Sequence, residues 1–150
     1  MKTLFDSNVA SEMIDRIERI SPQSSKAWGK MNVEQMLAHA GNALEMAMGT
    51  INPKRIFIGR IIGPIFRKNY SDEKPFEPGS PTSRELVTLD QSKDLNSEKE
   101  RLIALVKKFS FGGEAIATQQ PHPFFGPLTA REWGIGMYKH LDHHLRQFGG

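Results

Sequence analysis

The chain has 150 residues, 38% of them hydrophobic, and a formal net charge of +3 from 20 Lys and Arg against 17 Asp and Glu. This is the length of one ordinary domain with its own core, so we expect a single domain over residues 1–150. The absence of cysteine excludes disulfides, thiolate metal sites and a cysteine nucleophile, and the mild, interleaved charge without a reading motif argues against nucleic acid as a partner.

The first third of the chain predicts two amphipathic helices. Apolar residues recur at three- and four-residue spacing from Ser7 to Ile20, and Pro22 follows the end of that helix. A second helix begins after Asn32, whose side chain caps it, while Gln35 completes a variant of the capping box. The apolar face of the second helix carries Val33, Met36, Leu37, Ala40, Ala43, Leu44, Ala47 and Met48.

The segment from Pro53 to Tyr70 is both apolar and basic. Gly59, Gly63 and Pro64 interrupt it, so we expect a short helical insertion in pieces after the second helix. We expect this insertion to pack against the bundle or against a second copy of the chain. The alternative is contact of residues 54–68 with a membrane surface, which the glycines and the proline disfavour because they spoil a continuous apolar face.

The second half of the chain predicts two more long helices. Residues 71–88 are rich in Pro, Ser and charge, which is typical of a long connection. Apolar residues among alternating charges predict a third long helix from Ser92 to Phe109. Thr129 and Glu132 form a full capping box for a last helix that runs to Phe148. Four amphipathic helices with little strand signal predict an all-α fold, a four-helix bundle with a long crossover.

The sequence predicts neither a membrane span nor a targeting segment. No apolar run approaches the roughly 20 residues that span a bilayer. The first six residues include Lys2 and Asp6 and lack the apolar region of a signal peptide, so we expect a cytoplasmic protein.

Three of the five histidines lie in the last predicted helix: His140, His143 and His144. At 100° per residue, His140 and His144 fall about 40° apart at the centre of the apolar stripe, and His143 lies on its flank. Two imidazoles on a buried face are unfavourable unless their nitrogens are satisfied, and a metal ion on an i, i+4 pair satisfies them. The alternative is a structural pair, one ring bonded to a carbonyl or carboxylate and the other half exposed.

A metal site needs a third ligand, and His39 is the best candidate. It lies at the edge of the second helix's apolar face, where a partly buried structural histidine is an equal alternative. His122, in a proline-flanked loop, competes for the role. Three neutral imidazoles leave one position open for water, whose pKa a zinc ion lowers to about 7. Asp142 or Glu45 is a candidate for orienting a ligand histidine from behind.

Three segments of the chain resemble the DinB/YfiT-like superfamily of metalloenzymes. Residues 28–39, WGKMNVEQMLAH, resemble its signature leading into the second helix, and residues 140–147, HLDHHLRQ, resemble its closing motif. The FGPLT turn at residues 125–129, with Glu132 and Trp133, is similar to one uncharacterised branch of that superfamily. The match covers the whole chain in helix order.

The resemblance implies a four-helix bundle with a long crossover and a zinc or nickel site. The family's ligands carry over onto His39, His140 and His144, in agreement with the helical-wheel preference for His144 over His143. Characterised relatives join a low-molecular-weight thiol to an electrophile or isomerise maleylpyruvate, and dimers are common among them. A homodimer is therefore expected.

Two classes of function remain open from the sequence. In the first, the chain is an enzyme whose divalent metal activates a small thiol, such as glutathione or bacillithiol, or activates water for hydrolysis. In the second, it is a non-enzymatic, dimeric metal-binding or stress-response module. A site closed by four ligands would favour the second class, and an open site the first. The metal stays undetermined because imidazole suits zinc, nickel, iron and copper alike.

Overall fold

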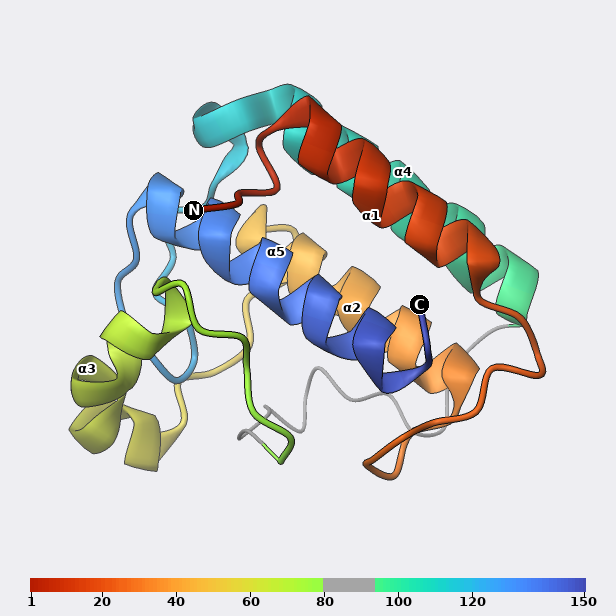
Figure 1. Ribbon diagram of the computed structural model, residues 1–150. Coiled ribbons are helices and arrows are strands. Elements are labelled where there is room, and N and C mark those ends of the chain that lie inside the picture. Colours follow the sequence, from red (N-terminus) through yellow and green to blue (C-terminus); the bar gives the residue numbers. More distant parts are fainter. Residues whose placement is uncertain (80–93) are drawn as a thin grey trace.

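The computed structural model describes residues 1–79 and 94–150, and in these ranges the protein is all-α, as predicted (Figure 1). Five α-helices pack as a bundle, and no strand occurs in the described ranges. The predicted connection beyond residue 79 and the predicted helix start at Ser92 lie outside them. That residues 1–150 form a single domain stays a prediction. The helices are α1 (Ser7–Arg19), α2 (Val33–Ala47), α3 (Phe57–Tyr70), α4 (Leu95–Gly112), the 3₁₀ helix η2 (Gly113–Ile116) and α5 (Ala130–Gln147).

Side-chain caps decide where α1, α2, α4 and α5 begin. At α2, the Asn32 side chain accepts from the Gln35 amide at 2.8 Å, and the Gln35 side chain accepts from the Asn32 amide at 2.9 Å. Thr129 and Glu132 make the same reciprocal pair at the start of α5. Both capping boxes are confirmed, and each satisfies amide groups that have no partner inside the helix. The other two long helices are capped by aspartates, Asp6 on α1 and Asp94 on α4.

Helices α1, α2, α4 and α5 enclose one apolar core. Figure 1 shows α1 alongside α4 in the upper part of the molecule and α2 with α5 below them. α4 packs against both α1 and α2, and α5 packs against α1, α2 and α3. Full burial of each large side chain contributes roughly 1.5–3 kcal/mol. The side chains with no exposed surface include Leu4, Met13, Ile17, Met36, Leu37, Leu102, Val106, Phe109, Trp133 and Leu145.

α3 differs from the prediction of short pieces, because it is one continuous helix of 14 residues. Pro64 lies inside it on the exposed side, where its ring meets solvent rather than the bundle. Gly59 and Gly63, one turn apart, face the loop that precedes α5. A Cβ on Gly59 would lie 2.7 Å from the Phe124 Cα, and one on Gly63 would overlap the Phe124 carbonyl oxygen. These glycines therefore serve close backbone approach and do not break the helix.

Charged groups anchor the C-terminal half of α3 to α5. Arg67 forms a two-pronged ion pair with Glu132, with its Nε 2.8 Å and its Nη2 2.6 Å from the two carboxylate oxygens. Hydrogen bonds from Arg67, above all, hold the pKa of Glu132 at about 2. Lys139 of α5 donates to Asp72 at 2.6 Å and to the Asn69 carbonyl oxygen. Bonds to charged groups of this kind are stronger than neutral ones, so α3 sits in a defined place beside α5.

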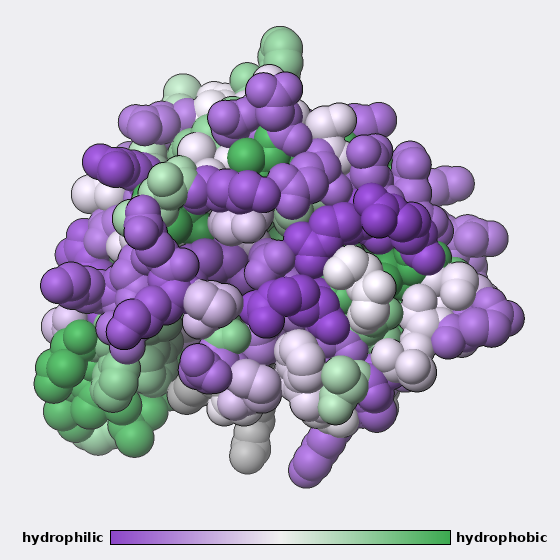
Figure 2. Space-filling model, viewed as in Figure 1, coloured by the Kyte–Doolittle hydropathy of each residue, from purple (hydrophilic) through white to green (hydrophobic). Residues whose placement is uncertain are grey.

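The outer face of α3 exposes large apolar side chains. Figure 2 shows a green patch at the lower left, where Figure 1 places α3. Contiguous apolar surface of this kind marks an interaction site. Among the described helices, none combines the length and apolarity needed to cross a membrane. The exposed side chains are Phe57, Ile58, Ile61, Ile65 and Phe66.

Candidate metal centre

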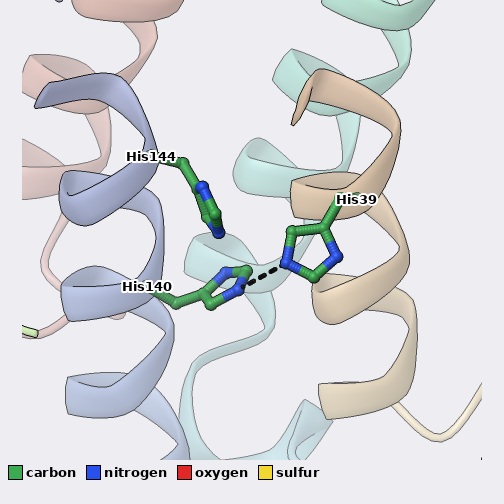
Figure 3. Close-up of side chains that lie close together, drawn as sticks. All are labelled: His39, His140 and His144. Atoms are coloured by element: carbon green, nitrogen blue, oxygen red, sulfur yellow. Dashed lines mark hydrogen bonds between the residues drawn. The ribbon is translucent and has the colours of Figure 1, made fainter. Parts of the chain in front are cut away.

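Three histidines converge between α2 and α5. Figure 3 shows His39 on α2 and His140 and His144 on α5, with their rings turned toward one another. One ring nitrogen from each lies within 4.8 Å of the other two. The Nε2 atoms of His39 and His140 are 3.0 Å apart. The structure thus brings together the three residues that the sequence singled out.

Burial sets the protonation state of this cluster. His39 has no exposed surface and His144 has 5%. The pKa of His140 lies well below 6.5, mainly because of desolvation and to a smaller extent because of the neighbouring His144 and His39. Desolvation, and to a smaller extent the neighbouring His39, lowers the pKa of His144 to about 3. His140 and His144 are therefore neutral at pH 7, which is the form of imidazole that binds metal ions.

Gln147 fixes the tautomer of His144, a role that the sequence analysis missed. The Gln147 side-chain nitrogen donates to the Trp28 carbonyl oxygen at 2.7 Å, so its Oε1 faces His144. That Oε1 accepts the Nδ1–H of His144 at 2.9 Å. The Nε2 lone pair of His144 is consequently left for the cluster. The available signal was the glutamine that ends HLDHHLRQ, three residues after His144 on the same helix.

Asp142 and Glu45, the candidates for orienting a ligand, do not touch the cluster. Asp142 instead accepts from Arg16 at 2.8 Å and from Arg146 at 2.9 Å. Glu45 pairs with Arg101 of α4 at 2.8 Å. Both carboxylates form ion pairs that hold the helices together. The expectation that one of them orients a ligand histidine was therefore wrong.

His143 and His122 lie outside the cluster. His143 donates from Nδ1 to the Phe76 carbonyl oxygen at 3.1 Å, which agrees with its place on the flank of the α5 stripe. His122 accepts on Nδ1 from the amides of Phe124 and Phe125 at 3.1 and 3.3 Å. Of the two candidates for the third position, the structure brings His39 into the cluster and leaves His122 in its loop.

The residues present fit a divalent metal ion. Zinc–nitrogen bonds of 2.0–2.1 Å in a tetrahedron place the nitrogens about 3.3 Å apart. The 3.0 Å between the Nε2 atoms of His39 and His140 is on that scale, and one ring nitrogen of His144 lies within 4.8 Å of both residues' ligand nitrogens. In the described part of the chain, no further His, Asp or Glu joins this group. Three ligands without a fourth leave room for a bound molecule.

A cavity of about 440 Å³ adjoins the cluster. It lies between α2, α3, α5 and the loop of residues 121–127, and the three histidines form part of its wall. This volume is typical of sites for small organic ligands. Most of the lining is apolar and includes Met46, Ile62, Phe66, Phe125 and Met137.

Replacing Gln147 with leucine should weaken metal binding by about 10–100-fold, because His144 then loses the acceptor that fixes its tautomer. The measurement is zinc affinity by competition with a chromogenic chelator. Arg146→Ala is the control, since Arg146 bonds to Asp142 and not to the cluster. An affinity for Gln147→Leu within threefold of the wild type would contradict the assigned role.

Acid should begin to destabilise the metal-free protein at pH values well above those at which its carboxylates titrate. Desolvation lowers the folded-state pKa values of His122 and His144 to about 3, whereas both are near 6.5 when unfolded. Below pH 6.5 the unfolded chain therefore binds protons that the folded chain does not. The free energy of unfolding consequently decreases as the pH is lowered. Each group contributes a loss of roughly 2 kcal/mol at pH 5. Denaturant unfolding at pH 7.5 and 5.0 with a chelator present measures this, and equal midpoints would contradict it.

A family model described as "Protein of unknown function (DUF1569)" matches residues 4–149, so the chain belongs to this family. The match includes all three clustered histidines and the FGPLT turn. No curated protein and no solved structure matches the chain.

Proposed function

We propose that this DUF1569 protein is a metal-dependent enzyme whose His39, His140 and His144 hold one divalent ion, zinc or nickel. The observation that carries the proposal is that three imidazoles meet at the wall of a cavity, with no fourth ligating side chain in the described ranges. An ion bound there lowers the pKa of a thiol or a water molecule and so supplies a nucleophile near neutral pH. The proposal includes membership of the DinB/YfiT-like superfamily.

The chain's own residues prepare the site in two ways. Gln147 holds His144 in the tautomer that presents Nε2 to the cluster, and it is tied in turn to the Trp28 carbonyl oxygen. The apolar walls contributed by α3 and the Phe125 loop limit the water around the reacting groups, which strengthens electrostatic interactions there. Both features favour a site prepared for chemistry over an incidental cluster.

The reaction that we favour is transfer of a low-molecular-weight thiol to an electrophile. The thiol sulfur forms a bond to an electrophilic carbon, the carbon releases its leaving group, and the thiol proton passes to solvent. The protein has no cysteine of its own, so none competes with a thiol substrate. Hydrolysis by activated water is the close variant.

A paired assay tests this function. Zinc- and nickel-loaded protein is mixed with glutathione, bacillithiol or cysteine and 1-chloro-2,4-dinitrobenzene, and separately with p-nitrophenyl acetate without thiol. We expect a metal-dependent rate that is lost in His140→Ala and kept in Arg146→Ala, because Arg146 bonds to Asp142 and does not line the cavity. A rate only with thiol supports transfer, and a rate without thiol supports hydrolysis. Fully loaded protein with neither rate would overturn the enzymatic proposal.

The second candidate function is a non-enzymatic, dimeric metal-binding or stress-response module. The exposed apolar side chains of α3 favour it, because they offer a surface for the predicted homodimer. Analytical ultracentrifugation of the wild type and of Ile61→Asp measures this association. A dimer that Ile61→Asp dissociates, combined with bound metal and no turnover, would favour this module over the enzyme.

A further inference from the structure

The described part of the wall of the cavity beside the histidine cluster is uncharged. Among the described residues that form its wall, none is Lys, Arg, Asp or Glu. A carboxylate or ammonium group placed there, away from the histidine cluster, would lose its hydration without gaining an ionic partner, which is strongly unfavourable. The body of any ligand in this cavity is therefore neutral, and its contacts with Ile62, Phe66 and Met137 favour an apolar one.

His122 supplies this cavity with a hydrogen-bond donor whose identity the geometry determines. Its Nδ1 accepts two backbone N–H groups, those of Phe124 and Phe125, so Nδ1 carries no proton. The proton of the neutral ring is then on Nε2, across the ring, and no described residue accepts it. Desolvation lowers the pKa of His122 to about 3, in agreement with a neutral ring at pH 7.

The His122 ring is also held in place. It packs against Phe125, Tyr70 and Trp133, with ring centroids 4.8, 5.3 and 5.5 Å away. A donor on a fixed ring loses little conformational entropy when it binds an acceptor, so its hydrogen bond retains most of its free energy.

Tyr70 is another lining residue that carries an unpaired donor. Its buried hydroxyl has no hydrogen-bond partner there, and its ring also lines the cavity. The tip of that ring, however, lies against Gly136 of α5, where an added Cβ would overlap its ring atoms. The hydroxyl is thus directed at the α5 backbone, and Tyr70 serves here as the matched control for His122.

We propose that the cavity binds a neutral, largely apolar molecule with a carbonyl-type acceptor, and that the Nε2–H of His122 donates a hydrogen bond to this acceptor. The identification of this molecule as the substrate, the electrophile beside the metal, rests on the proposed function. The binding of the molecule does not rest on it, because neither His122 nor the apolar wall is needed to hold the metal. A ketone, an ester or an amide on an aromatic or alkyl body belongs to this class.

The test compares three naphthalenes of similar size on metal-free wild-type protein, by fluorescence titration in the presence of a chelator. We expect 2-acetylnaphthalene to bind about five- to tenfold more tightly than 2-ethylnaphthalene, the difference of one hydrogen bond. We expect 2-naphthoate to bind at least about tenfold more weakly than the ketone. Tighter binding of the carboxylate, equal binding of ketone and hydrocarbon, or no binding of any probe would overturn the proposal.

Two variants assign the donor. In His122→Phe, the affinities for the ketone and for 2-ethylnaphthalene should differ by no more than about twofold, while 2-ethylnaphthalene binds as before. In Tyr70→Phe, the preference for the ketone should persist. Loss of the preference in Tyr70→Phe alone would overturn the role of His122. If His122→Phe does not fold, as judged by its thermal melt, the wild-type comparison and Tyr70→Phe still decide. Because no metal is present, a failure of the metalloenzyme proposal leaves these readouts unchanged.

Discussion

Alanine at His39, His140 or His144 should each abolish stoichiometric metal binding, while the wild type carries close to one ion per chain. Each substitution removes one of the three nitrogen donors of the cluster, and no further His, Asp or Glu joins it in the described ranges. We expect affinity to fall by more than about 100-fold, beyond the loss caused by removing a supporting hydrogen bond. Plasma mass spectrometry of protein purified without a histidine tag gives the metal content directly.

His143→Ala is the matched control for this series. It lies beside His144 on the same helix and is also buried, but it bonds to the Phe76 carbonyl oxygen and not to the cluster. Its metal content should equal that of the wild type. Circular dichroism should show that every variant remains helical. Folded wild-type protein that stays metal-free after incubation with zinc and with nickel would refute the metal centre.

Alanine at Gly63 should displace α3 from the bundle. The added methyl would overlap the Phe124 carbonyl oxygen, and backbone on both sides of the contact leaves no flexible side chain to yield. Overpacking of this kind destabilises by about 1–3 kcal/mol, which lowers Tm by roughly 2–10 °C for a chain of this size. Because Ile62, Phe66 and Tyr70 line the cavity, we also expect ligand binding there to fall by at least about tenfold.

Gly41→Ala provides the comparison for this effect. Gly41 is also a glycine inside a helix, but its added methyl would meet the end of the Arg101 side chain rather than backbone. Moving Arg101 would weaken its bonds to Asn42 and Glu45, so we expect a smaller drop in Tm than for Gly63→Ala. Limited proteolysis should cut Gly63→Ala within residues 57–70 and leave Gly41→Ala resistant there. Equal resistance of the two variants would show that the close approach of α3 to Phe124 does not hold the helix.

The local parts of this protein were predictable from the sequence. The capping boxes at Asn32 and Thr129 involve residues three positions apart, so a short segment contains everything that decides them. The same holds for His140 and His144, whose common face follows from helical geometry alone. The all-α class also follows from local periodicity, because each amphipathic helix needs a partner for its apolar stripe.

Continuity of α3 was not predictable in this way. Glycine and proline lower helix propensity, so Gly59, Gly63 and Pro64 predict breaks in the helix. Packing of the helix onto the Phe124 backbone requires the two glycines, while Pro64 lies on the exposed side of the helix. Tertiary contact therefore outweighed a local preference of about 1 kcal/mol per glycine.

By itself, the sequence determined the four long helices, their caps and the pair of histidines on one face of α5. The sequence already favoured His39 over His122 as the third residue, and the tertiary structure brings His39 into the cluster. Only the tertiary structure decided that Gln147, rather than Asp142 or Glu45, supports the cluster. His39 and His140 are 101 positions apart, and helical periodicity carries no information over such a distance. The packing of α2 against α5 brings their rings together, whereas two backbone amides hold His122 in its own loop.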